Sequence, residues 1–197
     1  MSIGDQISDV LVDAIVEALK EELQTNTDKA DPAYCAHVQG GKLQDDPIAA
    51  GETWGHSLEV HIGDPTSLED TWVDELASPE DPLVTMPRTG LPVYEIGGSG
   101  PVGVFWWRRG TIDVNSYFII KSYKRDEARQ IHNLLRYRVE KVLSQNHANA
   151  FMGLVNSEND ERVQLFMIVK SRARESGGPG QHIWRGKVWW QALVSRT

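Results

Sequence analysis

Residues 112–144 read IDVNSYFIIKSYKRDEARQIHNLLRYRVEKVLS and contain the change of periodicity that decides the fold. The first part, Ile112–Tyr123, is rich in β-branched and aromatic residues and predicts a strand. From about Arg125 to Ser144 the apolar residues recur at three- and four-residue spacing, which is typical of an amphipathic helix. The expected buried stripe of this helix consists of Ala128, Ile131, Leu135, Val139 and Val142. A strand that runs into a long helix is therefore the centre of the expected fold.

Further strands are predicted on both sides of this unit. Val102–Arg108 (VGVFWWR) precedes it, and Arg109–Gly110–Thr111 reads as a hairpin turn between the two strands. Val163–Lys170 (VQLFMIVK) and Ile183–Val194 (IWRGKVWWQALV) follow the helix. The segment between them, Ser171–His182, contains the glycine-rich tip GGPGQ, and we expect it to be a hairpin arm that can reach a neighbouring molecule.

The first quarter of the chain predicts a second helix. Ser2 and Asp5 have the spacing of a capping box, and the helix should end near Gln24. Its apolar residues recur at helical spacing. They are Ile7, Val10, Leu11, Ala14, Ile15, Ala18 and Leu19.

Residues 25–101 are less regular. His56–Gly63 predicts a half-buried strand, with Leu58, Val60 and Ile62 facing inward and Glu59 and His61 facing outward. Residues 68–76 suggest a short helix, and residues 78–101 hold too many prolines and glycines for regular structure. We expect 25–101 to be an insertion or arm within a single domain that spans 1–197.

Together these elements predict an α+β fold. The sheet should be mixed or antiparallel, with the N-terminal helix and the one long helix packed on one face, plus a long irregular insertion. A chain of 197 residues is long enough to bury a sizeable core without a metal or disulfide. Cys35 is the single cysteine, and no apolar run approaches the roughly 20 residues that span a bilayer. We therefore expect a product of a reducing cytoplasm with no membrane anchor.

Charge is distributed unevenly along the chain. Residues 1–101 carry 4 Lys/Arg against 20 Asp/Glu, a net −16, whereas residues 102–197 carry 16 against 8, a net +8. Two fields of opposite sign attract each other within a molecule or between neighbours. Solvated charged faces are one explanation, and head-to-tail packing of identical subunits is the other.

No catalytic or cofactor chemistry is expected. His56 and His61 are five residues apart on a predicted strand and should face opposite sides, and no spacing typical of a metal site occurs. The stretch around Ser99 lacks the context of a nucleophile elbow, and Cys35 has no adjacent base. Asp45 and Asp46 fit either a cation site or an ordinary turn. We expect neither an enzyme nor a bound metal or cofactor.

The second half combines tryptophan pairs with basic residues. Neighbouring residues of a strand face opposite sides, so each WW pair should place one ring inward and one outward. Outward rings beside arginines suit a protein interface, where both residue types are enriched, or stacking on nucleic-acid bases. The acidic first half disfavours the nucleic-acid alternative. The candidate interface residues are Trp106, Trp107, Arg108, Arg109, Arg172, Arg174, Trp184, Arg185 and Trp189.

Three segments together resemble a known family. They are the helix SDVLVDAIVEALKEEL (8–23), the strand NSYFIIKSY (115–123) running into KRDEARQIHNLLRYRVEKVL (124–143), and the closing strand IWRGKVWWQALVSR (183–196). Their order and local character resemble tail-terminator and tail-completion (neck) proteins of long-tailed bacteriophages. The similarity covers about 5–24 and 102–195 and involves no sharp motif, and residues 33–100 are longer than that family's core.

The resemblance implies a structural virion protein, made in the host cytoplasm and located in the tail or neck. It implies a homo-oligomeric ring of six copies that caps the tail tube. The ring's partners would be the tail tube protein and the head-tail connector protein. DNA would pass through its lumen without sequence-specific binding. A nucleic-acid-binding module that uses the basic, tryptophan-rich second half is the alternative function.

Overall fold

The computed structural model describes residues 7–44, 47–62, 94–95, 104–146, 150–157 and 160–196. These residues form two α-helices, α1 (Ile7–Lys20) and α3 (Arg125–Asn146), and a short π-helix, η1 (Glu21–Thr25), which continues α1. They also form the strands β1 (His37–Gly40), β2 (Trp54–Ile62), β3 (Tyr94–Glu95), β4 (Val104–Ile119), β5 (Val155–Asn156), β6 (Glu161–Glu175) and β7 (Gln181–Arg196).

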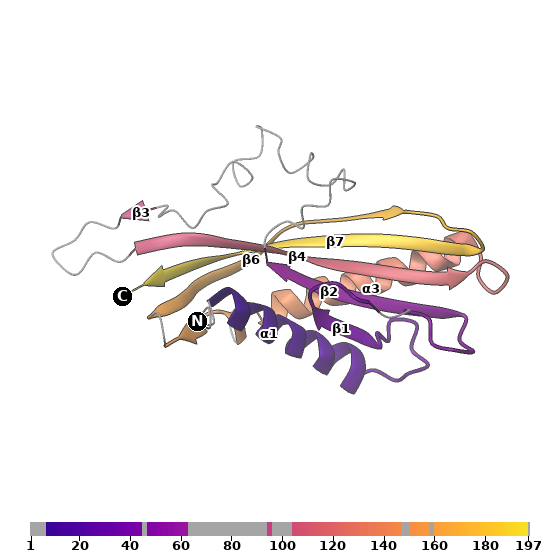
Figure 1. Ribbon diagram of the computed structural model, residues 1–197, viewed down its shortest axis with the longest axis horizontal. Helices are drawn as coiled ribbons and strands as arrows, with labels where there is room; N and C mark the ends of the chain where they lie inside the picture. Colours follow the sequence, from indigo (N-terminus) through magenta and orange to yellow (C-terminus); the bar gives the residue numbers. More distant parts are fainter. Residues whose placement is uncertain are drawn as a thin grey trace.

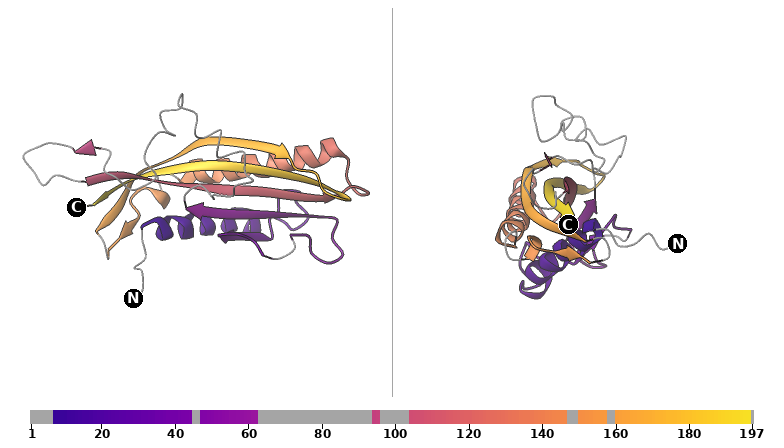
Figure 2. Two further views of the ribbon diagram at one scale, coloured as in Figure 1. Left: turned by 45° about the horizontal axis from the view of Figure 1, so that its top comes forward. Right: turned by 90° about the vertical axis from the view of Figure 1, so that its left-hand side faces the viewer.

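All the strands belong to one mixed sheet (Figure 1). Its order is β1-β2-β4-β7-β6-β5, and β3 pairs with β4 outside this path. β1 runs parallel to β2, and the other pairs are antiparallel. The sheet is built around β4 and β7, which pair along their whole length from Val104↔Arg196 to Ile119↔Gln181. In Figure 2 the end-on view shows the sheet curled, and the other view shows α1 and α3 running along the length of the strands.

One hydrophobic core lies between the helices and one face of this sheet. Leu11, Ile15 and Leu19 of α1 and Leu135 and Val139 of α3 are fully buried. They pack against alternate strand residues, because side chains two apart on a strand share a face. The buried strand residues of this core are Val38, Leu58, Val60, Ile112, Val114, Val163, Phe166, Val188, Trp190, Ala192 and Val194. The expected α+β class, with an N-terminal helix and one long helix packed against a mixed sheet, is confirmed.

The predicted hairpin at Arg109–Gly110–Thr111 is wrong, because β4 runs straight through these residues. Gly110 pairs with Trp190 of β7 and with Ile62 of β2. A Cβ atom at Gly110 would overlap the Trp190 ring and the His61 carbonyl. The glycine therefore marks a close approach in the middle of a strand and not a turn.

Part of the segment 25–101, which we expected to be an insertion or arm, belongs to the sheet. Its first part supplies β1 and β2, which are integral strands of the sheet. Within β2, Leu58 and Val60 are buried as expected, but Glu59 is buried too and Ile62 is exposed. Ile62 is the last residue of the strand, and Glu59 lies beside the charged Asp113 of the neighbouring strand β4. Most of the rest of this segment, including the predicted helix at 68–76, lies outside the described residues, as do Ser2 and Asp5.

The segment Ser171–His182 is shorter as a loop than predicted. β6 continues to Glu175 and β7 begins at Gln181, so the connection consists of residues 176–180. The amide of Ser176 donates to the carbonyl of Ile183, and Gly177 and Gly180 have positive φ angles of 52° and 73°. The glycines allow the left-handed backbone that this tight connection requires. No helix among the described residues is long and apolar enough to cross a membrane.

Candidate functional site: a charged sheet face, a basic hairpin and an acidic stripe

The sheet face that points away from α1 and α3 carries a row of charged side chains. Glu59, Asp113, Lys187 and Arg172 are successive cross-strand partners on β2, β4, β7 and β6. The row is acidic at β2 and β4 and basic at β7 and β6. Lys187 Nζ lies 3.5 Å from Asp113 Oδ1, although the lysine is only 4% exposed. Burying an ammonium is costly unless a carboxylate accompanies it, so this pair is a fixed part of the fold.

Four basic side chains gather on the β6–β7 hairpin, which we call the basic hairpin: Lys170, Arg172, Arg174 and Arg185. The first three alternate along β6 and therefore share a face. Arg174 is the direct cross-strand partner of Arg185. The three arginines are exposed and Lys170 is half-buried. Like charges placed directly opposite each other raise the energy of the sheet, and an anionic group brought close to them would lower it.

A complementary surface lies on α1 and η1. Asp9, Asp13, Glu17 and Glu21 occur at four-residue intervals and are all exposed, and we call them the acidic stripe. They lie on the helix side opposite to the buried core residues of α1. Glu17 pairs with Lys20 at 3.4 Å, and that pair is exposed. In Figure 1 the stripe's helix lies below the sheet, and the end of β6 that carries the basic hairpin lies at the upper right.

The predicted interface residues separate into two groups. Arg172, Arg174 and Arg185 come together in the basic hairpin, whereas Trp184 and Trp189 are buried, at 8% and 4% exposure. Trp190 is buried as well, so the expectation of one inward and one outward ring is wrong for this pair. The sheet is covered on both faces here, and the Lys170 ammonium lies 5.7 Å from the centre of the Trp189 ring. These tryptophans stabilise the fold and do not present a stacking surface.

The other four predicted residues lie on β4. Trp106 and Trp107 pair through their backbones with Val194 and Leu193, and their side chains lie outside the described residues. Arg108 and Arg109 are half-buried in the middle of the sheet. Burial lowers the pKa of Arg108, and the charge of Glu161 opposes that shift. Arg108 and Arg109 pair with Ala192 and Gln191 of β7, several residues along the strand from Arg185 of the basic hairpin.

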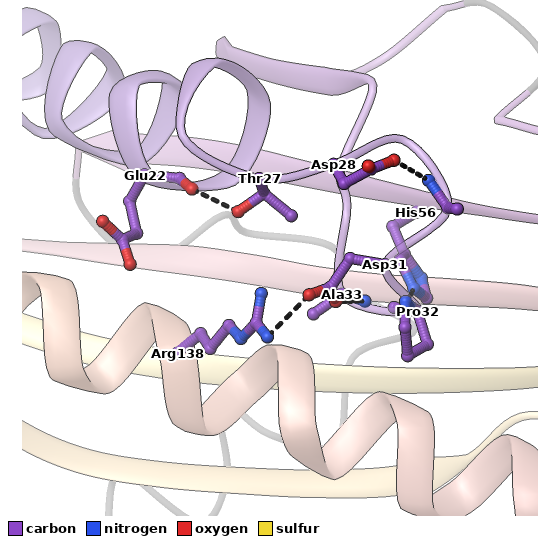
Figure 3. Close-up of polar contacts among 9 residues, drawn as sticks. Glu22, Thr27, Asp28, Asp31, Pro32, Ala33, His56 and Arg138 are labelled. Carbon is purple, nitrogen blue, oxygen red and sulfur yellow. Dashed lines mark hydrogen bonds and ion pairs between the residues drawn. The ribbon is translucent and has the colours of Figure 1, made fainter.

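A groove of about 360 Å³ lies between the loop that follows η1 and helix α3. Figure 3 shows its central contact, in which Arg138 donates to Asp31 at 2.9 Å. Asp31 also accepts from the amide of Ala33. Partial burial raises the pKa of Asp31, but the Ala33 amide and the adjacent Arg138 outweigh it, so this pKa lies below its usual value. The groove is lined by Glu22, Asn26, Thr27, Asp28, Asp31, Leu134, Tyr137, Arg138 and Lys141. The Asp31–Arg138 ion pair in this groove therefore connects the loop to α3.

Two buried histidines lie on the core face. The Ser116 hydroxyl and His132 Nδ1 are 2.9 Å apart, and His56 Nε2 lies 2.8 Å from the Pro32 carbonyl oxygen. Burial lowers the pKa of His56 to about 4 and that of His132 to about 3, with the charges of His56 and Arg136 adding to the shift at His132. Ser116 and His132 are both fully buried. A substrate therefore has no access to this serine–histidine pair.

Cys35 is equally enclosed. Its thiol donates to the carbonyl of His37, and burial raises its pKa to about 12. Because the thiolate is the reactive form, this residue is inert at neutral pH.

One cluster was missed by reading the sequence. Glu59 and His61 on β2 and Asp113 on β4 bring one ligand atom each within 4.8 Å of one another. His56 and His61 do face opposite sides of β2, as the alternation along the strand predicts. The signal that finds the cluster is the pairing of β2 with β4, which places Asp113 opposite Glu59. Asp45 and Asp46 lie outside the described residues. Neither the protein-family models nor the curated proteins contain a match to this sequence.

Proposed function

We propose that this chain is a structural subunit that assembles head to tail into a ring, as a tail-terminator or tail-completion protein of a virion. The observation that carries the proposal is the separation of the acidic stripe on α1 from the basic hairpin on β6 and β7. A ring built from identical subunits needs two unlike surfaces that complement each other. These two surfaces meet that requirement with opposite charges on different elements.

The order of elements adds support from the resemblance in the sequence. An amphipathic N-terminal helix, a strand that leads into a long helix, and a long closing strand occur in the same order in α1, β4, α3 and β7. By this resemblance the ring would hold six copies and would cap the tail tube. It would then join the tube to the head connector while DNA passes through its lumen. The location would be the tail or neck of the virion.

Assembly is also favoured over catalysis by the polar groups of the core. The serine–histidine pair and the thiol are enclosed, and in the groove beside α3 the Asp31 carboxylate is paired with Arg138. The charged side chains that do reach solvent are arranged as extended surfaces. Extended charged surfaces suit recognition of another macromolecule better than the chemistry of a small substrate.

The alternative is a nucleic-acid-binding module that uses the basic hairpin. Four cations on two adjacent strands would contact a phosphate backbone. However, Trp184, Trp189 and Trp190 are buried and supply no stacking platform. Titration with single-stranded DNA at two salt concentrations separates the two functions. Salt-dependent binding of DNA by the monomer would favour the alternative.

The oligomeric state tests the proposed function. Light scattering and negative-stain microscopy of the full chain should show rings of one copy number at about 0.1 M salt, where the Debye length is about 10 Å. At about 1 M salt, where that length falls to about 3 Å, the rings should dissociate, because charge attraction holds the surfaces together. A strictly monomeric protein at both salt concentrations and at high protein concentration would contradict the proposal.

A further inference from the structure

The acidic end of the charged row contains a set of side chains suited to a metal ion. His61 Nε2 lies 3.7 Å from Glu59 Oε2 and 3.8 Å from Asp113 Oδ2. These separations are too long for hydrogen bonds. They are close to the spacing of about 3.4 Å expected between two ligand atoms that share a tetrahedral ion at about 2.1 Å. All three ligand atoms lie within 4.8 Å of one another, so rotation of the two carboxylates can bring them around one centre.

The neighbouring side chains orient both carboxylates for this role. Asn115 Nδ2 donates to Glu59 Oε1 at 3.4 Å, and Lys187 Nζ approaches Asp113 Oδ1 at 3.5 Å. Each carboxylate thus turns one oxygen to an outer partner and the other oxygen toward His61. Metal ligands are commonly held by outer partners in this way. The backbone is also rigid here, because Glu59 and His61 are two apart on β2 and Asp113 is the cross-strand partner of Glu59.

Access and charge are compatible with an ion. The side chains of Glu59, His61 and Asp113 are 12%, 16% and 22% exposed, so an ion can enter and retain a water ligand. Two carboxylates and one Lys187 ammonium leave a net charge of −1, which a dication reverses only to +1. A set of one imidazole and two carboxylates suits a borderline dication such as Zn²⁺ better than Mg²⁺ or Ca²⁺, which prefer oxygen alone.

We propose that Glu59, His61 and Asp113 bind a transition-metal dication of the Zn²⁺ class that links β2 to β4 on the polar face of the sheet. Water completes the coordination. The site is independent of ring formation, because all three ligands come from one subunit. It would stabilise the subunit itself, by holding the strand before residue 63 against the centre of the sheet.

Cobalt provides the test, because tetrahedral Co²⁺ has a visible absorption band. The metal-free full chain is titrated with Co²⁺ at neutral pH, and Zn²⁺ is then added. We expect one equivalent of Co²⁺ to produce the band, Zn²⁺ to abolish it, and Zn²⁺ to raise the thermal midpoint of the chain. Mg²⁺ at the same concentration should neither abolish the Co²⁺ band nor raise the thermal midpoint.

Two variants test the position of the ion, and one variant of a similar histidine–carboxylate pair on another part of the sheet is the control. His61→Gln and Glu59→Gln should each weaken binding at least about tenfold, since even outer partners of ligands change affinity by about 10- to 100-fold. The control is His182→Gln. His182 lies 3.8 Å from Glu175 and is as exposed as His61, but it belongs to no three-ligand group among the described residues. Asp113 is left unchanged, because its removal would take the carboxylate from the buried Lys187.

Two results of the cobalt titration would contradict the proposed metal site. If no visible band forms, or if it persists unchanged in His61→Gln, the three side chains are an ion-pair network and not a metal site. A band lost in His182→Gln instead would place the ion elsewhere. Metal binding can be measured on the monomer and on the ring. A negative result for metal binding therefore does not contradict the proposed assembly, and a monomeric protein does not contradict the metal site.

Discussion

Gly110 shows how strongly a single residue can constrain this sheet. It lies in the middle of β4, where a Cβ atom would overlap both the Trp190 ring and the backbone carbonyl of His61. Gly110→Ala should therefore lower the free energy of unfolding by about 2 kcal/mol or more, since the neighbours must move apart. Urea denaturation measures this change. Gly41→Asn is the control, because no heavy atom lies near that position and Asn tolerates its positive φ of 77°. Equal stability of Gly110→Ala and wild type would contradict the close packing described.

The buried histidines make stability depend on pH. The pKa is about 4 for His56 and about 3 for His132 in the folded chain, both depressed by burial from 6.5. Below pH 6.5 the unfolded chain therefore binds more protons than the folded chain, and stability falls as the pH falls toward the folded pKa values. Between pH 7 and pH 5 we expect a loss of about 4 kcal/mol for the two groups together.

Denaturant titrations at several pH values between 7 and 5 measure this loss. His132→Asn preserves an acceptor for the Ser116 hydroxyl but cannot titrate. This variant should be less stable than wild type at pH 7 and should lose only about half as much stability on acidification. A stability that stays constant between pH 7 and pH 5 in the wild type would show that neither histidine is held neutral.

At the scale of elements, one contact ties the loop after η1 to α3. Asp31 and Arg138 are 2.9 Å apart and about a quarter exposed, at 27% and 28% of the side chain. A double-mutant cycle with Asp31→Asn and Arg138→Gln should give a coupling energy of about 1 kcal/mol. The matched cycle on Asp126 and Arg129, at 81% and 53% exposure, should give about 0.3 kcal/mol or less. Equal coupling in the two cycles would mean that partial burial adds nothing to the Asp31 pair.

The elements with strong local patterns could be predicted from the sequence. The long helix was expected at about 125–144 and extends from Arg125 to Asn146, since its apolar stripe is periodic and polar segments flank it. Strands were also expected at the positions of β2, β6 and β7. The continuous β4 could not be predicted, because Arg-Gly-Thr has turn chemistry and the reason for Gly110 is Trp190, which is 80 residues away.

The candidate site was predicted in part for a similar reason. The arginines of β6 and β7 were identified because charge is visible in the sequence. The burial of Trp189 was missed, since alternation along a strand predicts which face a residue points to but not whether that face is covered. The Glu59, His61 and Asp113 cluster depends on the pairing of β2 with β4, which no local pattern contains.

At the scale of the molecule, the net charges of −16 and +8 on the two halves of the sequence correspond in part to separate surfaces. Part of the negative charge forms the acidic stripe along α1 and η1, and part of the positive charge forms the basic hairpin. The stripe lies on a helix that packs on one face of the sheet. The basic side chains point from the other face, because they alternate with core residues such as Val188. The subunit therefore has two unlike surfaces on opposite sides of the sheet, which favours attraction between copies.

Charge reversal tests this central claim most directly. Asp13→Lys with Glu17→Lys reverses the acidic stripe, and Arg172→Glu with Arg174→Glu reverses the basic hairpin. Each double variant alone should be monomeric, since its two surfaces then carry the same sign. Arg129→Glu, which changes an exposed arginine on α3, is the control and should assemble as wild type does.

The decisive measurement is native mass spectrometry of the two double variants mixed in equal amounts at low salt. The account predicts that the mixture recovers closed assemblies in which the variants alternate, so the copy number is even and each variant contributes half. Assembly of either double variant alone, or a mixture that remains monomeric while wild type assembles, would contradict it.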